Sequence, residues 1–285
     1  MTVYILRGPS GSGQTTFRRH PSFQDALVVS RDIIRQMFGL QGKGKLTPAQ
    51  ENQVTEIEIE LLREALRRGQ NVVVDNTNLN NNFARRYADE AHLMGHSFVE
   101  FNLYNPEDKE KYVVRSDVPK DVVLQQCRQA DKMKVLVSRI PEPFKVVEQD
   151  ETLPHAYIFD IDGTLAKMGD RSPYDYTKVH LDTLIEPVAN ILKRLDRVFI
   201  VSGRSSECLT ETVEWLDRNR INYDKLYMRV EGDLRPDSVV KSDILDRITE
   251  THYVEGVFDD RHRVLEMWRT RGVYTFDVGQ GKAKW

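Results

Sequence analysis

The sequence predicts two α/β domains in tandem, each built on a doubly wound parallel sheet. Three observations lead to this fold class. Short apolar runs typical of buried strands alternate with helical patterns along the whole chain, which is the order of βαβ units. The alternation is interrupted once, at residues 146–154, which are acidic, lack clear periodicity and end in Pro154. The length of 285 residues also suits about two domains of ordinary size.

The first half of the chain contains four apolar runs that we expect to form strands, namely Val3–Leu6, Leu27–Ser30, Asn71–Asp75 and Ser97–Leu103. Between the second and third runs, Gln50–Arg68 has helical periodicity, with glutamates near its start and arginines near its end. This distribution of charge complements the helix dipole. These elements define a first domain at residues 1–148.

The second half repeats the alternation over residues 149–285. The expected strands are Ala156–Phe159, Arg197–Val201, Lys225–Met228 and Val254–Phe258, and the expected helices are Leu181–Leu195, Ser205–Asn219, Val239–Thr249 and Arg261–Arg271. Open parallel sheets bind ligands at the carboxyl ends of their strands. Polar residues at those ends are therefore the candidate site residues.

The composition limits the partners and the location of the protein. Lys plus Arg total 41 and Asp plus Glu total 44, a formal charge of −3, so any contact with nucleic acid must come from a local basic groove. Cys127 and Cys208 lie far apart in the sequence and fit neither a disulfide framework nor a metal site. The apolar start is too short for a signal peptide, and no stretch approaches the ~18 apolar residues of a membrane span, so we expect a cytoplasmic protein.

Polar residues that could contribute to one site follow the expected strands of the second domain. They are Asp160 and Asp162, then Ser202, Gly203 and Arg204, then Asp237 and Lys241 at the start of a helix, then Asp259 and Asp260. Any single aspartate here could be a helix N-cap. Together, these residue types favour phosphate chemistry, with a carboxylate nucleophile, a second carboxyl for proton transfer, an ammonium and a hydroxyl for phosphoryl oxygens, and acids for Mg²⁺.

The segment Asp160–Thr164 reads Asp-Ile-Asp-Gly-Thr and resembles the haloacid dehalogenase superfamily, whose Asp-x-Asp-Gly-Thr motif it matches at each position. The resemblance implies that Asp160 attacks phosphorus to form an aspartyl-phosphate, and that Asp162 protonates the leaving alcohol and then activates water. It also implies that Ser202 and Lys241 bind the phosphoryl group. The residues implied at the metal are Asp160, Asp162, Asp259 and Asp260.

The spacing of these residues bears on the size of the substrate. Asp162 and Ser202 are 40 positions apart, and Ser202 and Lys241 are 39 positions apart. The expected strands and helices already fill both intervals, so neither can hold a separate lid domain. An enzyme of this superfamily without a lid has an open site, which suits a phosphate on the end of a polymer.

A second phosphate signature lies near the N-terminus, where residues 8–15 match the P-loop pattern except that Gln14 replaces its lysine. Backbone N–H groups of such a loop wrap phosphates at a helix N-terminus. The expected nucleotide-binding residues are Gly8, Gly11, Gly13, Gln14, Thr15 and Thr16.

Loss of the lysine removes a cation from the γ-phosphate. At an effective dielectric of about 20, a unit charge about 4 Å from a phosphate charge contributes roughly 4 kcal/mol. If roughly 2–4 kcal/mol of this stabilises the transition state, the rate falls roughly 30- to 1000-fold. Arg7, Arg18 or Arg19 could substitute in part, although no pattern directs them to the phosphates.

Two polar segments follow the next strands. Asp32 and Arg35 share one helical face, as a general base and an anion-binding group would. Residues 75–80, Asp-Asn-Thr-Asn-Leu-Asn, add polar groups. The alternatives are an N-cap with an i,i+3 ion pair and an ordinary polar loop.

The order of motifs along the chain is similar to that of the phage polynucleotide kinase-phosphatase family, which joins a 5′-hydroxyl kinase to a 3′-phosphatase. The resemblance adds Arg171, Arg204 and Asp237 to the phosphatase site, with the arginines suited to clamping phosphate oxygens. It implies Mg²⁺ and ATP or another nucleotide as cofactors. RNA or DNA ends with a 3′-phosphate or 5′-hydroxyl are the implied partners, homo-oligomers occur among such enzymes, and a phage-encoded protein would act in the host cytoplasm.

The kinase half departs from that family in two places. Besides Gln14, the arginine-bearing lid expected after Pro106 is shortened to a segment containing Arg115 alone. We therefore hypothesise a slow or inactive kinase that binds nucleotide or nucleic-acid ends. Two alternatives stay open: a capless phosphatase for another substrate fused to a degenerate binding module, and a non-catalytic end-binding scaffold. No motif distinguishes RNA from DNA.

Overall fold

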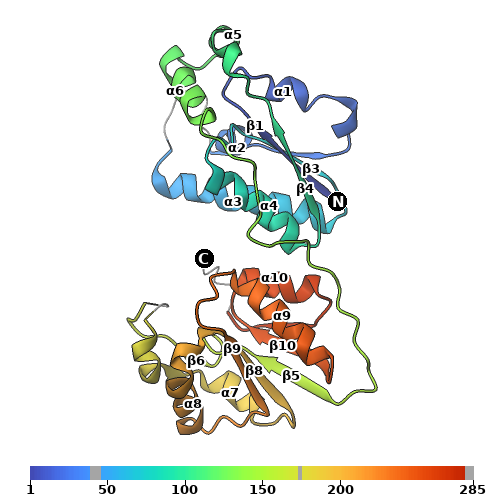
Figure 1. The fold of residues 1–285 in the computed structure, drawn as a ribbon, viewed down its shortest axis with the longest axis vertical. Coiled ribbons are helices and arrows are strands. Elements are labelled where there is room, and N and C mark those ends of the chain that lie inside the picture. Colours follow the sequence, from blue (N-terminus) through green and yellow to red (C-terminus); the bar gives the residue numbers. More distant parts are fainter. Residues whose placement is uncertain (39–45, 173–174, 280–285) are drawn as a thin grey trace. The chain divides into compact units, whose positions relative to one another are not determined.

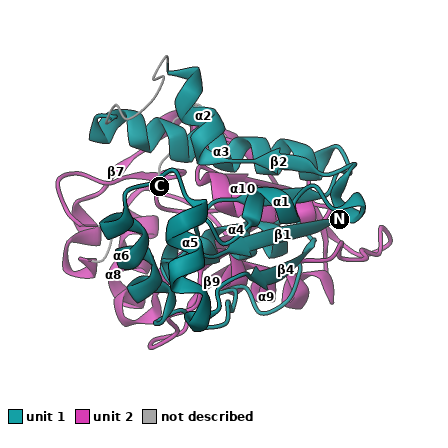
Figure 2. Ribbon diagram, turned by 90° about the horizontal axis from the view of Figure 1, so that it is seen from above, with its two compact units in different colours: residues 1–143 teal, residues 144–285 magenta. Residues whose placement is uncertain are grey.

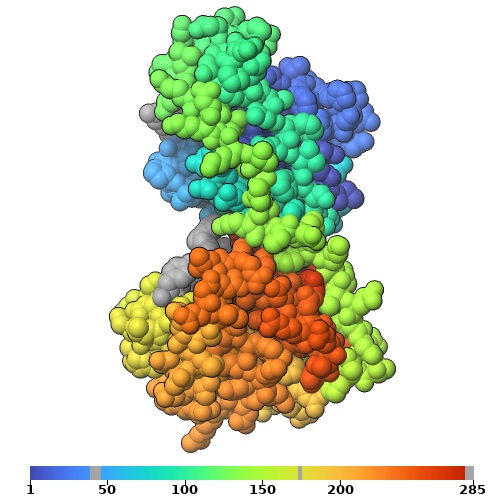
Figure 3. Space-filling model, in the orientation of Figure 1, coloured from blue at the N-terminus to red at the C-terminus, as the bar shows by residue number. Residues whose placement is uncertain are grey.

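The computed structural model describes residues 1–38, 46–172 and 175–279, and the chain divides into two compact units, residues 1–143 (unit 1) and 144–285 (unit 2) (Figures 1 and 2). The division falls five residues before the boundary that the sequence predicted. Residues 144–148 belong to unit 2 because Val147 donates its N–H to the Arg271 carbonyl at 2.9 Å and Val146 packs against Gly272. The joining segment 141–155 is largely exposed (Figure 3).

Unit 1 contains a parallel sheet in the order β2-β3-β1-β4. Its strands are β1 (Thr2–Arg7), β2 (Leu27–Val29), β3 (Val72–Asp75) and β4 (Ser97–Asn102). Its α-helices are α1 (Gln14–Phe17), α2 (Arg31–Met37), α3 (Pro48–Arg67), α4 (Asn81–Leu93), α5 (Lys109–Arg115) and α6 (Lys120–Ala130), with short 3-10 helices η1 (Pro21–Phe23) and η2 (Pro106–Asp108).

Both faces of this sheet are buried. Val3 and Ile5 of β1 pack on one face with apolar residues of α3 and α4. Leu6 faces the other side, where it packs with Phe17 and Phe23. Alternate residues of a strand point to opposite faces, so an apolar run that is continuous along the strand requires helices on both sides.

The predicted helix Gln50–Arg68 is present as α3. It begins two residues earlier, at Pro48, because Thr47 forms a capping box with Gln50. Proline at the first turn of a helix removes no hydrogen bond. The sequence signal for the start of α3 was therefore the Thr-Pro pair that precedes the periodic segment.

Unit 2 contains a parallel sheet in the order β11-β10-β5-β8-β9 and an antiparallel pair, β6-β7. The strands are β5 (His155–Phe159), β6 (Ala166–Lys167), β7 (Thr183–Leu184), β8 (Val198–Ser205), β9 (Lys225–Arg229), β10 (Tyr253–Asp259) and β11 (Thr275–Asp277). The helices are η3 (Tyr176–Leu181), α7 (Glu186–Leu192), η4 (Ser206–Cys208), α8 (Leu209–Arg218), α9 (Asp237–Thr249) and α10 (His262–Thr270). The two parallel sheets confirm the predicted fold class.

Two elements of unit 2 differ from expectation. The single helix predicted for Leu181–Leu195 is divided into η3, β7 and a shorter α7, which begins near Pro187. β8 continues to Ser205 through an irregularity between Ser202 and Ser205, so the Ser-Gly-Arg segment lies within the strand and not after it. A bulge of this kind redirects side chains at a strand end.

The hydrophobic core of unit 2 packs against the sheet, and the candidate site lies at the carboxyl ends of the strands. Phe159 and Ile200 pack with apolar residues of α7 and α8 on one face, including the fully buried Trp215. In the described part of the two intervals noted above, the chain forms β6, η3, β7, α7 and β8, then η4, α8, β9 and the start of α9, and no separate lid domain is present. No helix in the described ranges is long and apolar enough to cross a membrane.

Candidate active site

Asp160, Lys241 and Asp259 form the centre of the site. β5 and β10 are neighbours in the sheet, with Phe159 paired to Phe258, so the aspartates at their carboxyl ends emerge side by side. α9 supplies Lys241, whose Nζ lies 2.9 Å from Asp160 Oδ1 and 2.8 Å from Asp259 Oδ2. All three side chains are buried. The structure therefore brings together the predicted nucleophile and the predicted phosphate-binding lysine.

The charges of this group are strongly coupled. Burial raises the pKa of Asp160 well above its ordinary value, and the nearby carboxylates raise it further, although Lys241 opposes them. Burial lowers the pKa of Lys241, but attraction to Asp160 and Asp259 outweighs burial, and the net pKa of the lysine is raised. Lys241 is thus a fixed ammonium in an acidic cluster.

Asp160, Asp259 and Asp260 each place a carboxylate oxygen within 4.8 Å of the others. Such oxygens are the hard donors that Mg²⁺ prefers. The turn after β5 fits closely around them, because a Cβ at Gly163 would collide with the Asp260 carboxylate. The donor set therefore fits a divalent cation.

The Asp162 carboxylate does not lie in this group of three, and its place among the metal residues stays a prediction. Arg204 donates from Nε to Oδ2 at 2.9 Å and from Nη2 to Oδ1 at 2.7 Å, and Arg171 donates from Nη2 to Oδ1 at 2.9 Å. Burial raises the pKa of Asp162, but these arginines outweigh burial and the net pKa is lowered. Its carboxylate is held in a fixed orientation by two arginines.

Arg171 and Arg204, which the sequence predicted to bind phosphate oxygens, contact acids in this structure. Their side chains are 3% and 1% exposed, and both bind carboxylates. Besides Asp162, both contact Asp182: Arg171 donates from Nη2 to Oδ2 at 2.6 Å and Arg204 from Nη2 to the same oxygen at 2.8 Å. Their donors are used to orient acids, so in this structure they position Asp162.

Asp182 is the residue of the site that sequence reasoning missed. It is buried between η3 and β7, and Trp215 Nε1 donates to its backbone carbonyl at 2.7 Å. No motif contains it, and the sequence analysis placed it in an expected helix. The one available signal was an isolated acid in the largely apolar stretch 179–185.

Ser202, Gly203 and Asp237 meet at the bulge of β8. Ser202 is fully buried, and its Oγ accepts the N–H of Arg204 at 3.3 Å. A Cβ at Gly203 would collide with the Asp237 carboxylate, which explains why glycine is needed there. Asp237 accepts a hydrogen bond from Arg261 Nη1 at 3.0 Å. These three predicted site residues are therefore brought together next to α9.

The glycine-rich loop of unit 1 joins β1 to α1. Gly11 and Gly13 have φ of 83° and 94°, a conformation that favours glycine. Gln14 Nε2 donates to the Asn76 carbonyl at 2.6 Å, and the Ser10 N–H donates to Gln126 Oε1 at 2.8 Å. A side chain of α6 thus contacts the backbone of the loop at Ser10.

Gly8, Thr15 and Thr16, the remaining residues predicted to bind nucleotide, lie in or directly after the glycine-rich loop. Gly8 donates its N–H to the Thr77 carbonyl at 3.0 Å, which ties the loop to the segment after β3. Thr15 and Thr16 are exposed on the four-residue helix α1. Arg115 is the last residue of α5, a helix that borders the loop because the Tyr112 carbonyl packs against Gly11.

The arginines considered as substitutes for the missing lysine have other partners. Arg7 is fully buried, and its Nη1 donates to Glu100 Oε1 at 2.6 Å. Arg18 Nη1 pairs with Asp75 Oδ2 at 2.7 Å. Arg19 is exposed. Neither Arg7 nor Arg18 supplies the cation that Gln14 lacks.

Asp32 and Arg35 line a cavity of about 420 Å³, together with Ser10 and the segment after β3. Arg35 Nη1 donates to Asp32 Oδ1 at 2.9 Å, and Arg35 Nε donates to Glu51 Oε1 at 3.0 Å. The Asp32 side chain is 86% exposed, so it remains accessible to a ligand. Asp32 and Arg35 therefore lie beside the glycine-rich loop, as the functional interpretation predicted. They also form the i,i+3 ion pair that was the alternative interpretation.

The sheet edge of unit 2 defines a phosphatase domain of the haloacid dehalogenase type, and the loop of unit 1 defines a P-loop domain before it. Residues 154–282 match a family model described as the phosphatase domain of polynucleotide kinase PNKP, and residues 3–133 match an AAA domain model. These two matches lie on units 2 and 1 respectively, a phosphatase-domain model after an AAA-domain model. The resemblance drawn from the sequence is confirmed.

Individual relatives extend the comparison. A protein of Autographa californica nuclear polyhedrosis virus, provisionally named a bifunctional polynucleotide kinase/RNA ligase, is 26% identical over 299 residues, which cover 94% of this chain. The match covers 41% of that relative, so the chain spans about two fifths of its length. A chain in the structure of the Pnkp1/Rnl/Hen1 RNA repair complex is 27% identical, with coverage of 97% of this chain and 95% of that chain and a TM-score of 0.47. A second structure of the Pnkp1/Rnl/Hen1 complex is 28% identical over the same shares, also with a TM-score of 0.47.

Proposed function

We propose that unit 2 removes a 3′-phosphate from the end of RNA or DNA through an aspartyl-phosphate intermediate. The observation that carries the proposal is the buried group of Asp160, Lys241 and Asp259, with the clamped Asp162 two positions after Asp160. The match of residues 154–282 to the phosphatase domain of polynucleotide kinase PNKP supports a nucleic-acid end as substrate. The absence of a lid domain among the described residues suits a polymer end.

The chemistry divides into two displacements at phosphorus. Asp160 attacks phosphorus with a carboxylate oxygen, the bond from phosphorus to the 3′-oxygen breaks, and Asp162 gives a proton to that oxygen. Water then attacks phosphorus, Asp162 takes its proton, and inorganic phosphate leaves Asp160. Asp162 is ionised in the free site; a phosphate dianion beside it favours the protonated form, because like charge raises the pKa of a carboxyl group.

The other residues bind and orient. Lys241 holds Asp160 in place and, with Ser202, contacts phosphoryl oxygens. Asp160, Asp259 and Asp260 would hold Mg²⁺, which when bound supplies positive charge to the phosphoryl oxygens. Arg171, Arg204 and Asp182 keep the Asp162 carboxylate directed at the leaving oxygen and the attacking water.

We also propose that unit 1 binds nucleotide or a 5′-hydroxyl end and transfers phosphate slowly or not at all. The amide of Gln14 gives no cation to the γ-phosphate, and Gln126 occupies the Ser10 N–H. The Asp32 carboxylate remains exposed in its cavity, as a general base for a 5′-hydroxyl requires.

Phosphate release from a 3′-phosphorylated oligonucleotide, compared with release from an aryl phosphate, tests the substrate. We expect the oligonucleotide to be hydrolysed with the higher kcat/KM, and Asp160→Ala to abolish release from both. A clear preference for the aryl phosphate would instead support the capless phosphatase with another substrate. Activity retained by Asp160→Ala on either compound would refute the nucleophile.

A further inference from the structure

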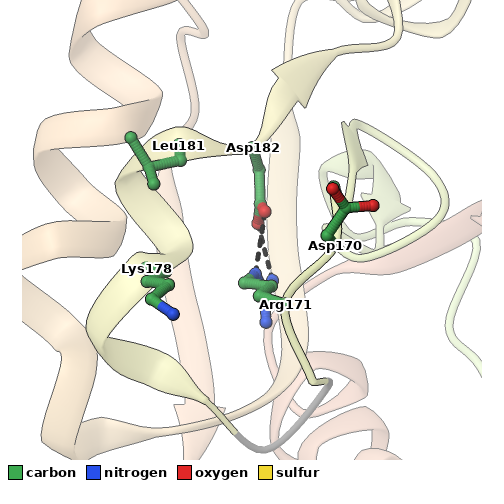
Figure 4. A pocket seen from close by; sticks show the side chains of 6 residues that line it. Asp170, Arg171, Lys178, Leu181 and Asp182 are labelled. Carbon is green, nitrogen blue, oxygen red and sulfur yellow. Dashed lines mark hydrogen bonds and ion pairs between the residues drawn. The ribbon is translucent and has the colours of Figure 1, made fainter.

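Unit 2 contains a cavity of about 260 Å³ lined in part by Arg171 and Asp182 (Figure 4). Its lining residues come from the loop after β6 and from η3 and the segment that follows it: Gly169, Asp170, Arg171, Lys178, Leu181 and Asp182. Neither the family motifs nor the reaction steps above account for Lys178 or Leu181. The question is what this space holds.

Arg171 connects the cavity to the chemistry. The same Nη2 atom donates to Asp162 Oδ1 at 2.9 Å and to Asp182 Oδ2 at 2.6 Å (Figure 4 shows the contact with Asp182). In the proposed reaction Asp162 protonates the leaving oxygen, so the leaving nucleoside must lie on the Asp162 side of the phosphorus. Arg171 lines the cavity and contacts Asp162, so this side chain joins the cavity to that acid.

The charges around the cavity leave one cation available to a ligand. Arg171 and Asp182 form an ion pair with each other, and Arg204 also binds the Asp182 carboxylate. Lys178 is 57% exposed, and its Nζ lies 3.4 Å from Asp175 Oδ2, an exposed ion pair worth at most about 1 kcal/mol. Figure 4 shows Asp170 across the cavity from Lys178. The formal charges of the lining cancel, with Arg171 and Lys178 against Asp170 and Asp182, and Lys178 is the base among them whose side chain is largely exposed.

The size and the apolar wall limit the ligand. The cavity is smaller than the ~300–1,000 Å³ typical of sites for drug-sized molecules, so it suits a single nucleoside. Leu181 is 65% exposed beside Lys178, an apolar surface next to a cation. A terminal nucleoside with a phosphodiester on its 5′ side has the same combination of a ring and a nearby negative charge.

We propose that this cavity binds the last nucleoside of a 3′-phosphorylated polynucleotide and that Lys178 contacts the phosphodiester on its 5′ side. The inference rests on the proposed 3′-phosphatase function and deepens it. A nucleoside 3′-monophosphate lacks that phosphodiester. Lys178 therefore makes the site prefer a polymer end over a mononucleotide.

The test compares Lys178→Ala with the wild-type chain on two substrates, a 3′-phosphorylated oligonucleotide and a nucleoside 3′-monophosphate. We expect KM for the oligonucleotide to rise about 3- to 10-fold with kcat unchanged, since an exposed ionic contact contributes about 1 kcal/mol. KM for the mononucleotide should not change. The slope of log kcat/KM against log salt for the oligonucleotide should fall by about one.

Lys193→Ala is the matched control. Lys193 is an exposed lysine that caps the carboxyl end of α7, which leads into the start of β8 and so lies at the opposite edge of the sheet from the site. This variant should match wild type on both substrates, and Lys178→Arg should restore the oligonucleotide KM. An unchanged oligonucleotide KM in Lys178→Ala, or an equal rise on both substrates, would overturn the inference. A wild-type chain that releases no phosphate from the oligonucleotide would refute the proposed function itself.

Discussion

At the residue scale, the partner of each acid decides what that acid can do. Asp160 shares Lys241 with Asp259, whereas both oxygens of Asp162 accept hydrogen bonds from arginines. The two members of one short motif therefore have pKa values displaced in opposite directions, upward for Asp160 by burial and downward for Asp162 by its arginines despite burial.

The role of Asp182 gives a first prediction. Asp182→Asn removes the charge that holds Arg171 and Arg204, so Asp162 loses its fixed orientation while the nucleophile is untouched. We expect kcat for 3′-phosphate release to fall roughly 10- to 100-fold, the usual effect of removing a supporting hydrogen-bond partner in an active site, with KM little changed. Steady-state kinetics measure this, and a thermal melt reports any loss of folding. A variant with normal kcat would show that Asp182 has no positioning role.

Gln14 gives a second prediction at this scale. Gln14→Lys restores a cation to the loop, and we expect transfer of γ-phosphate to a 5′-hydroxyl oligonucleotide to increase roughly 30- to 1000-fold. Radiolabelled ATP measures the transfer, and 3′-phosphate release by unit 2 serves as the unchanged control. Near-normal kinase turnover by the chain with Gln14 would contradict the proposed loss of activity.

At the element scale, strand ends account for what the sequence could predict. β5 and β10 were recognised from apolar runs, and their neighbouring places in a parallel sheet bring Asp160 and Asp259 together. The arrangement in which Arg171, Arg204 and Asp182 hold Asp162 was not predictable. These residues are brought together by η3 and the bulge of β8, which leave no periodic pattern in the sequence. The contact of Gln126 with the glycine-rich loop likewise depends on how α6 packs.

The turn after β5 yields an element-scale prediction with a matched control. Gly163 and Gly232 both have positive φ, 87° and 80°, so alanine at either costs roughly 1–2 kcal/mol of conformational energy. A Cβ at Gly163 would also displace the Asp260 carboxylate, whereas a Cβ at Gly232 meets no atom within 4 Å. We expect Gly163→Ala to lose most phosphatase activity and to need more Mg²⁺. Gly232→Ala should lower the melting temperature alone, and equal losses of activity in both variants would contradict the role assigned to the turn.

At the scale of the whole molecule, the two units match their phosphate-site motifs to different degrees. Unit 2 contains the acids, the lysine and the serine that the family motif requires, whereas the loop of unit 1 lacks its cation. Both units use the carboxyl ends of parallel strands, which is why sequence patterns located them.

The carboxylate cluster predicts a dependence on divalent cation for the whole chain. Three buried carboxylates next to a single lysine attract Mg²⁺. We expect EDTA to abolish 3′-phosphate release and added Mg²⁺ to restore it, as measured by release of inorganic phosphate. Full activity after exhaustive chelation would exclude a metal at this cluster.

The central claim is that Asp160 forms an aspartyl-phosphate with phosphate taken from a 3′ end. Acid quenching during turnover of an oligonucleotide with a radiolabelled 3′-phosphate measures this directly. The account predicts label bound covalently to the wild-type chain, released by mild base, and absent from Asp160→Asn. Rapid release of inorganic phosphate without any labelled protein, or equal labelling of Asp160→Asn, would contradict it.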